Sequence, residues 1–309
     1  MSGRTHDSNR VTRTLSDPGS ISATVGESTA VSQWRRWRLV LPALLWTVAF
    51  FVVPLLCMVV MSLWQRAGGE IVASWDLQNY INFFSKPHLV KALINSLEIS
   101  LIVTVISILL AYPLAWIIAF RVPERWQRTA LILAILPFWT SYVVRSYAWL
   151  LVLSKKGIVN SFLLNAGLIA EPLAIASSRY ATIIGFVHFF VMLLTLTIYA
   201  NLKQLSPNYA RAAADLGAGP VRTFWHVILP LTLPGVMVGG FLTFVLCIGD
   251  YITPKILGGS NELVLPQVIM LQIGRRADFP NAAAMSIILM LVVTLAYVLC
   301  ARWLKMERS

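Results

Sequence analysis

The sequence predicts an all-α polytopic membrane protein with six transmembrane helices and a short cytoplasmic helix between the fourth and the fifth. Composition is the first observation behind this fold class. Hydrophobic residues make up 58% of the 309 residues and charged residues 12%, and the mean hydropathy is +0.73, which excludes an ordinary soluble domain. The second observation is a set of six apolar runs. The third is a polar stretch, rich in alanine and glycine, between the fourth and fifth runs.

Each apolar run is long enough to cross about 30 Å of hydrocarbon at a rise of about 1.5 Å per residue. Unpaired backbone groups cost several kcal/mol in hydrocarbon, so each run is expected to be helical. Six crossings leave both termini on the same side of the membrane. The predicted spans are residues 40–64, 97–120, 130–153, 182–200, 227–248 and 282–304.

The positions of lysine and arginine predict the orientation. One side of the membrane carries basic residues close to the spans, in short connections, whereas the opposite side has longer loops whose basic residues are partly balanced by acids. By the positive-inside rule the first side is the cytoplasm, so both termini are expected there. The basic residues of this side are Arg35, Arg36, Arg38, Arg121, Arg125, Arg128, Lys203, Arg211, Arg222, Arg302, Lys305 and Arg308.

The spans are expected to form one domain, residues 37–304, between two tails. Residues 1–36 are rich in Ser, Thr and Gly and lack apolar periodicity, which predicts a disordered cytoplasmic tail. Residues 305–309 form a short cytoplasmic C-terminal tail. We attribute the net charge of +12 to topology and to contact with anionic membrane lipid, since the basic residues are dispersed and no nucleic-acid-binding motif accompanies them.

The polar stretch YARAAADLGAGPVRTFWHVILPLTLPG, residues 209–235, predicts a short helix at a membrane surface. Helix-forming residues 211–216 end at Gly217, and Gly219 and Pro220 then interrupt the chain before the fifth span begins. The alternative is an ordinary cytoplasmic loop with one helical turn. The residues that we assign to this loop are Arg211, Ala212, Ala213, Asp215, Gly217, Gly219 and Pro230.

This stretch resembles the EAA loop of ABC-importer permeases, a loop that docks on a cytoplasmic ATPase. Ala212, Ala213, Gly217, Leu229 and Pro230 match the family pattern, whereas Arg211 stands where the family usually has Glu. Two further segments, PFWTSYVVRSYAWLLVLSKKGIVN (residues 137–160) and GDYITPKILGG (residues 249–259), are similar to the permeases of spermidine/putrescine importers. The likeness covers roughly residues 37–303.

The resemblance implies one permease subunit of a binding-protein-dependent importer in a bacterial inner membrane. Its implied partners are a dimer of cytoplasmic ATPase subunits, a second permease chain of different sequence and a periplasmic substrate-binding protein. The implied substrate is a small polar organic solute such as a polyamine, an opine or a similar amine. The chain itself is expected to bind no cofactor, because ATP and Mg²⁺ belong to the partner ATPase.

Three ionisable residues lie in the predicted spans or at their rims, where a charge costs about 2.5–3.5 kcal/mol at a helix centre. They are Glu98, Arg145 and Asp250, and counting along the helices places all three near the outer interface. We take them as candidates for the translocation path or an outer gate, with Arg145 balanced by Glu98 or Asp250. The alternative is that these side chains snorkel to a wet interface and do not bind substrate.

Aromatic residues surround Arg145 and predict an aromatic-walled cavity, because aromatic faces attract organic cations. Phe138, Trp139 and Tyr142 are the candidates here, and Tyr251 follows Asp250 in the chain. The alternative for this region is the aromatic belt of a bilayer interface. In the fifth span, prolines and glycines predict either a bend or close helix packing.

Enzyme chemistry finds no support in the motifs. The four histidines are scattered without zinc-site spacing, and the sequence contains neither a nucleophile elbow nor a Gly-x-x-x-x-Gly-Lys-Ser/Thr phosphate loop. Energy is therefore expected to come from a partner. The alternative function is a secondary transporter or channel driven by an ion gradient, with Glu98 and Asp250 as coupling carboxylates. A membrane enzyme is a third and weaker alternative.

Overall fold

A computed structural model of the chain describes residues 40–259 and 262–306, with side chains up to residue 302. The predicted tail of residues 1–36 lies outside the described residues, as do the last three residues of the C-terminal tail. The chain divides into two units between Met58 and Val59. The described part of the first unit is helical and belongs to the candidate span Val40–Ser62. This span contains the π-helical turn η1 (Val48–Val52) and the helix α2 (Val53–Ser62).

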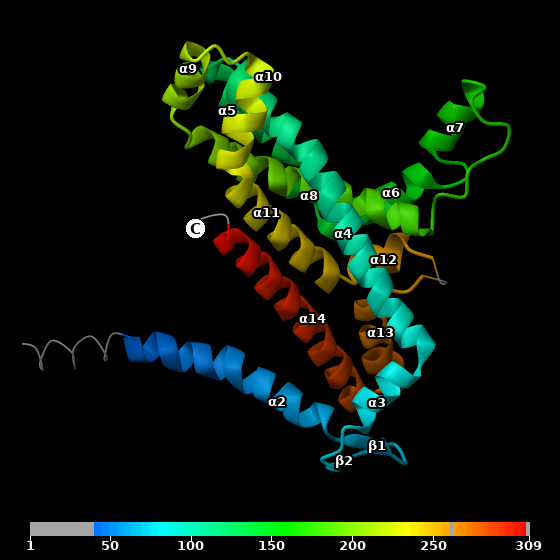
Figure 1. The fold of residues 1–309 in the computed structure, drawn as a ribbon. Coiled ribbons are helices and arrows are strands. Elements are labelled where there is room, and N and C mark those ends of the chain that lie inside the picture. Colours follow the sequence, from blue (N-terminus) through cyan, green and yellow to red (C-terminus); the bar gives the residue numbers. More distant parts are fainter. Residues whose placement is uncertain (1–39, 260–261, 307–309) are drawn as a thin grey trace, which may run out of the picture. The chain divides into compact units, whose positions relative to one another are not determined.

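Helices dominate the second unit as well (Figure 1). Several of the long helices contain a π-helical or 3₁₀ turn. The α-helices are α3 (Gln78–Ser85), α4 (Pro87–Trp116), α5 (Glu124–Ile135), α6 (Tyr142–Leu153), α7 (Ile158–Asn165), α8 (Arg179–Lys203), α9 (Pro207–Asp215), α10 (Pro220–Thr223), α11 (Leu229–Gly249), α12 (Ile252–Leu257), α13 (Leu265–Leu271) and α14 (Phe279–Met306). The other turns are η2 (Ile117–Arg121), η3 (Leu136–Trp139), η4 (Phe224–Ile228) and η5 (Gln272–Arg276).

Five helical segments of the described chain are long and apolar enough to cross a membrane. Their ends lie within a few residues of five predicted spans, with two exceptions: the helices predicted to begin at residues 97 and 227 begin ten and seven residues earlier. The segments are Val40–Ser62, Pro87–Arg121, Arg179–Lys203, Pro220–Gly249 and Phe279–Arg302. The mostly helical, multi-pass fold class is therefore confirmed.

The remaining predicted span, residues 130–153, is not a straight helix. Glu124–Trp139 and Tyr142–Asn165 are bent by 88° relative to each other, and they reach the count of six only if the bent pair is one span. Pro137 lies in the 3₁₀ turn η3, and the backbone of Thr140 and Ser141 is extended. Hydropathy registers the apolar residues on both sides of this break but not the change of direction.

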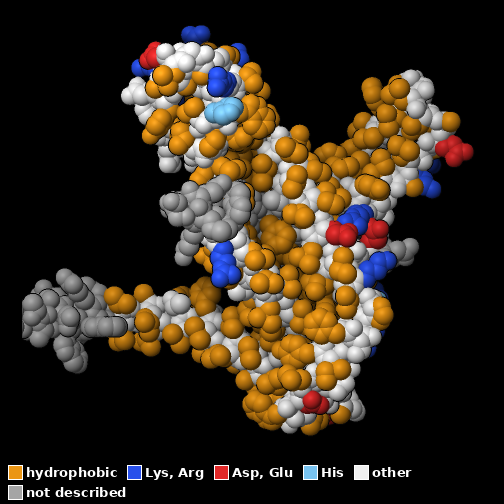
Figure 2. Space-filling view, viewed as in Figure 1, with side chains coloured by type: hydrophobic (Ala, Val, Ile, Leu, Met, Phe, Trp, Pro, Cys, Tyr) orange, Lys and Arg blue, Asp and Glu red, His pale blue; other side chains and the backbone are white. Residues whose placement is uncertain are grey.

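The core lies where α4, α8 and α11 pack on one another (Figure 1). Buried apolar side chains from all three helices meet there, and Tyr112 on α4 and Thr232 on α11 share a buried hydrogen bond of 2.9 Å between their hydroxyls. A second cluster joins α3, α4, α13 and α14. Figure 2 shows apolar side chains over much of the visible surface, as expected for helices that face lipid, with basic side chains gathered over α9 and α10.

Glycines on α11 explain the close approach of its neighbours. A Cβ atom on Gly235 would lie 1.6 Å from the side-chain nitrogen Nδ2 of Asn201 on α8. A Cβ atom on Gly240 would lie 2.8 Å from Cδ1 of Ile108 on α4. Gly239 faces Leu194 at 3.1 Å in the same way. These contacts favour close packing over bending as the reason for the glycines.

The structure also contains a small hairpin that the all-α prediction missed. Strands β1 (Gln65–Ala67) and β2 (Glu70–Val72) pair antiparallel, with Arg66 opposite Ile71. The two-residue turn between them consists of Gly68 and Gly69, both at positive φ, as a tight hairpin turn requires. Two three-residue strands give too little alternation to be recognised in a hydropathy pattern.

We predict that Gly235→Val lowers the thermal stability of the detergent-solubilised protein, because overpacking costs about 1–3 kcal/mol. Gly249→Val is the matched control. Gly249 ends the same helix, and a Cβ atom there has no neighbour within 4 Å. An equal fall in unfolding temperature for both variants, measured by tryptophan fluorescence, would contradict the packing role of Gly235.

Candidate functional site

The helix expected from the alanine- and glycine-rich stretch is α9. Its start is set by Ser206, whose Oγ accepts a hydrogen bond of 3.3 Å from the amide of Asn208, and by Pro207 at the first helical position. Its end is a Schellman motif: Ala218 N–H donates to Ala213 O and Gly217 N–H to Ala214 O, both at 2.9 Å. Gly217 has φ of +79°, which a residue with a side chain rarely adopts.

The chain restarts as a helix immediately after this stop. Gly219 precedes α10, and α10 runs through the π-helical turn η4 into α11. Pro230, the second residue of α11, has no amide hydrogen, and the preceding amide, Leu229 N–H, donates to Phe224 O in the wider π-helical pattern. The helix–stop–helix order predicted for this segment is therefore present.

Exposure separates two faces of the α9–α10 segment. Ala213 is buried where α9 packs on η4, whereas Arg211, Ala212 and Asp215 are exposed. Beyond the end of α9, Leu216 is 89% exposed and Val221 is 71% exposed. These two side chains form an apolar tip, residues 216–221, on an otherwise polar segment.

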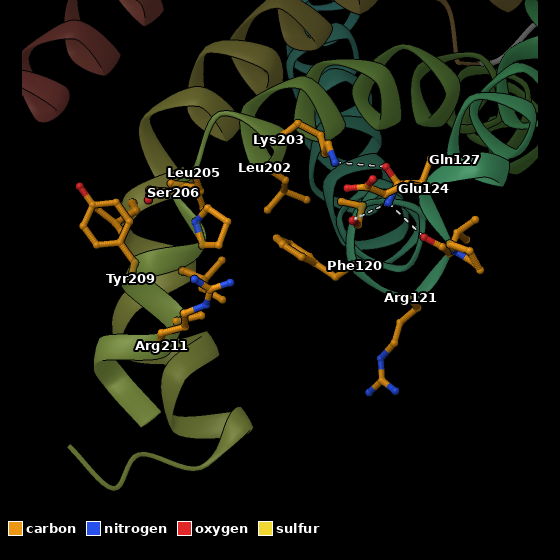
Figure 3. A pocket seen from close by; sticks show the side chains of 17 residues that line it. Phe120, Arg121, Glu124, Gln127, Leu202, Lys203, Leu205, Ser206, Tyr209 and Arg211 are labelled. Atoms are coloured by element: carbon orange, nitrogen blue, oxygen red, sulfur yellow. Dashed lines mark hydrogen bonds between the residues drawn. The ribbon is translucent and has the colours of Figure 1, made fainter. Parts of the chain in front are cut away.

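A cavity of about 670 Å³ lies at the base of α9, between α9 and the connection from α4 to α5 (Figure 3). Figure 3 shows Arg211 on the α9 wall and Arg121, Glu124 and Gln127 on the other. The two predicted cytoplasmic connections thus meet around one cavity. Gln127 joins them, because its Oε1 accepts from Lys203 Nζ at 3.2 Å while its amide donates to the carbonyls of Ala119 and Val122.

Asp250 lies at a different place, in the corner between α11 and α12. Its carboxylate accepts from the amides of Ile252 (2.9 Å) and Thr253 (3.3 Å) and from the hydroxyl of Tyr142 (2.5 Å). Tyr142 also contacts the hydroxyl of Thr253. Asp250 therefore caps α12 and attaches it to the first residue of α6.

Arg145 is buried at the break in the third predicted span. Its Nη1 donates to the carbonyl of Pro137 at 2.7 Å, and its guanidinium lies 5.0 Å from the ring centre of Phe189 and 5.5 Å from that of Tyr142. Thr140 Oγ1 donates to the same carbonyl at 2.7 Å. The backbone N–H of Thr140 also donates to this carbonyl, at 3.3 Å in the 3₁₀ turn, so Arg145 adds a side-chain donor to a carbonyl at the end of the helix.

The pairing expected for Arg145 is wrong. Glu98 on α4 instead forms an ion pair with Arg179 on α8, with 2.6 Å between Oε2 and Nη2. This is the one ion pair among the described side chains. Charge complementarity suggested that Arg145 would contact a carboxylate, but its guanidinium contacts the carbonyl of Pro137 and two aromatic rings instead. Glu98 and Asp250 are held by different partners on different helices.

The aromatic candidates divide in a similar way. Phe138 stacks on Phe189, with ring centres 5.4 Å apart, and is half-exposed, while Trp139 is 77% exposed. Tyr251 lies under Lys255 and lines a separate cavity of about 450 Å³ with Arg275. Tyr142 contacts two other candidates: its hydroxyl donates to Asp250, and its ring lies beside the guanidinium of Arg145.

Sequence reasoning missed four residues that organise these sites: Phe189, Thr253, Arg179 and Gln127. Asp250 followed by a short helix is an N-terminal capping pattern that would have indicated Thr253. The single glutamine in the basic second connection was a weaker signal for Gln127. Nothing in the sequence pointed to Arg179 as the partner of Glu98.

We predict that Tyr142→Phe destabilises the corner between α6 and α12. Hydrogen bonds to charged groups contribute about 1.5–3 kcal/mol, so the unfolding temperature in detergent should fall. Tyr147→Phe is the control, because the hydroxyl of this half-exposed tyrosine makes no hydrogen bond within the described residues. Equal unfolding temperatures for the two variants would show that the contact with Asp250 contributes nothing to stability.

Known proteins resemble this chain in sequence and in fold. The spermidine/putrescine transport system permease protein PotB of Salmonella typhimurium is 34% identical over 251 residues, which is 81% of this chain and 87% of the relative. The crystal structure of a bacterial ABC transporter involved in the import of the acidic polysaccharide alginate matches with a TM-score of 0.69 at 17% identity. The match covers 89% of this chain and 98% of the chain in that structure.

A second structure, of the bacterial alginate ABC transporter in complex with an alginate pentasaccharide-bound periplasmic protein, matches with a TM-score of 0.70 at 15% identity, over 88% of this chain and 94% of that chain. At these identities the two structures show the shared fold alone. The family model of binding-protein-dependent transport system inner membrane components matches residues 100–306, more than half of the chain. The chain therefore belongs to this family, the multi-pass inner-membrane permeases of ABC importers.

Proposed function

We propose that this chain forms part of the translocation path for a small polar organic amine, a polyamine first and an opine or similar amine second. ATP hydrolysis in a separate subunit powers the transport. Family membership establishes an importer permease. The observation that carries the energetic coupling is the α9–α10 segment, with its exposed apolar tip at residues 216–221.

The α9–α10 segment has the properties of a lever between a partner and the spans. α9 is stopped by a Schellman motif, Ala213 packs on η4, and α10 continues through η4 into α11. A force on the tip would reach α11 without passing through a flexible loop. α11 in turn packs on α4 and α8, so movement of this helix repacks the core.

We place the α9 side in the cytoplasm, with both termini there, because the connections around the basal cavity carry Arg121, Lys203 and Arg211. The partner at the tip is a dimer of cytoplasmic ATPase subunits that binds ATP and Mg²⁺. A second permease chain of different sequence completes the path, and a periplasmic substrate-binding protein delivers the solute. This chain, in this assignment, is a transport subunit without its own ATPase site.

Two features favour an amine as the substrate. The PotB relative carries spermidine and putrescine in its name. Phe138 and Trp139 present exposed aromatic faces at the break between η3 and α6, where a cationic solute would gain cation–π attraction. The carboxylate of Asp250 already accepts three hydrogen bonds, so in this proposal the aromatic faces supply the attraction for the cationic solute.

The ion-gradient alternative loses its motivation. It required free carboxylates at Glu98 and Asp250, but Glu98 is paired with Arg179 and Asp250 caps α12. Family membership points in the same direction. These observations therefore favour the importer permease over a secondary transporter.

The coupling assignment predicts the composition of the native complex. A tagged chain, purified from its own membranes in mild detergent, should bring down an ATPase and a second permease. Gly217→Val should reduce that recovery, because a β-branched residue is strongly disfavoured at a φ of +79° and the end of α9 would shift. Mass spectrometry of the purified material measures both proteins.

Gly167→Val is the matched control for this experiment. Gly167 has φ of +69° and, like Gly217, no neighbour within 4 Å of an added Cβ atom, but it lies in the loop after α7. Its variant should retain the ATPase. Recovery of the tagged chain alone, under conditions that keep other importers intact, would refute the proposed assembly.

The substrate assignment predicts ATP-dependent uptake of spermidine by proteoliposomes that contain the full importer and its binding protein. Trp139→Leu should slow uptake about 5- to 30-fold, the equivalent of a cation–π contact of about 1–2 kcal/mol. Trp126→Leu is the control, since Trp126 is half-exposed on α5 and lies outside the break. Uptake of an opine but not of spermidine would replace the polyamine by the second candidate.

A further inference from the structure

We propose that the cavity at the base of α9 binds the phosphodiester headgroup of an anionic phospholipid, of the phosphatidylglycerol type. The cavity has a volume of about 670 Å³, within the range of about 300–1,000 Å³ usual for small-molecule sites. Its lining contains three cations, Arg121, Lys203 and Arg211, and one carboxylate, Glu124. This inference needs only a membrane-spanning permease and is independent of the substrate.

The cations of the cavity are not neutralised within the described chain. The one ion pair among the described side chains joins Glu98 and Arg179, so Glu124 is not within ion-pair distance of any of the three cations. Lys203 Nζ is held 3.2 Å from the neutral Oε1 of Gln127, whose side chain is buried and fixed by two backbone carbonyls. The ammonium group is thus positioned while its charge is left uncompensated.

The depth of the cavity fits a headgroup. Arg121 is the last residue of the membrane-length segment Pro87–Arg121, and Lys203 is the last residue of Arg179–Lys203. Cations at the ends of spans lie at the level of lipid phosphates, where they contribute about 1 kcal/mol each to the binding of anionic lipid. Each of the two spans therefore ends in a cation that lines the same cavity.

The floor of the cavity favours a lipid over free phosphate. Beneath the cations the lining is apolar and comes from the ends of the spans, with Phe120, Leu202, Ile228 and Leu231. Figure 3 shows Phe120 and Leu202 between the α9 wall and the wall that carries Gln127. Such a surface accommodates the glycerol and upper acyl region of a lipid, which inorganic phosphate lacks.

The geometry of α9 also separates this site from protein docking. The exposed apolar tip is at residues 216–221, after α9 has ended, whereas Ser206 and Pro207 at the start of α9 line the cavity. An ATPase seated on the tip contacts the far end of the segment. The base remains beside the spans, where lipid is the available anionic partner.

The test is native mass spectrometry of the purified importer complex, titrated with phosphatidylglycerol or with phosphatidylcholine of the same acyl chains. Phosphatidylglycerol should bind the wild type in preference to phosphatidylcholine. Arg121→Gln combined with Lys203→Gln should weaken binding about 30-fold, the equivalent of about 1 kcal/mol for each cation removed. Arg125→Gln combined with Arg128→Gln removes the same amount of charge from α5, outside the cavity lining, and this variant should bind like the wild type.

Four results would overturn the proposal. They are equal binding of the two lipids by the wild type, equal loss in both double variants, displacement of phosphatidylglycerol by equimolar inorganic phosphate, and binding that appears only after the ATPase has been stripped from the complex. The last would assign the cavity to an acidic surface of that protein. If Arg121→Gln with Lys203→Gln does not assemble, the charge-conserving pair Arg121→Lys with Lys203→Arg replaces it and should keep the preference. A failed pull-down of the ATPase leaves this test intact, because the lipid is measured on the permease mass.

Discussion

A backbone carbonyl without a donor costs several kcal/mol in hydrocarbon, and three interruptions of the helical pattern show how this chain meets that cost. At the break after Pro137, the side chains of Arg145 and Thr140 donate to the Pro137 carbonyl in addition to the backbone N–H of Thr140. Before Pro230, a π-helical turn changes the bonding pattern of the backbone around a residue that has no amide hydrogen. At the end of α9, Gly217 allows a Schellman motif to pair two carbonyls. The interruptions at Pro137 and Gly217 change the direction of the chain, whereas the helix continues through the turn before Pro230.

The break at Pro137 determines the corner on the side opposite α9. Because η3 and α6 meet at a sharp angle, Tyr142 lies at the start of a new helix and can reach Asp250 and Thr253 on the chain after α11. With a straight third span, Asp250 would accept hydrogen bonds from the backbone amides of Ile252 and Thr253 alone. Arg145 thus contributes to the corner indirectly: it stabilises the bend, and the bend positions Tyr142. This is a structural reason for an arginine in an apolar segment that requires no substrate.

Hydropathy was sufficient for five spans and insufficient for the sixth, because it measures how apolar a segment is and not where it turns. Pro137 was recognisable as a kink, but an angle of 88° depends on the packing of α6 against α12 and α8. Gly217 was recognisable as a helix stop, because it follows a run of helix-forming residues and glycine adopts the left-handed backbone that commonly ends a helix. The partner of Arg145 was not recognisable. A carboxylate can be identified in a sequence, whereas every residue has a carbonyl. Only the fold shows that the carbonyl of Pro137 lies beside Arg145.

Arg211 lies on α9, between the start of this helix at Pro207 and the tip at residues 216–221. The importer family usually has Glu at this position, and here the side chain of Arg211 lines the cavity with Arg121 and Lys203. A glutamate would add a second carboxylate beside Glu124 and balance the two remaining cations. Arginine leaves the cavity with an excess of positive charge, while the features that end α9 and expose its tip, Ala213 and Gly217, are retained. Arg211 therefore affects the charge of the cavity, whereas Gly217 determines how α9 ends and presents its tip.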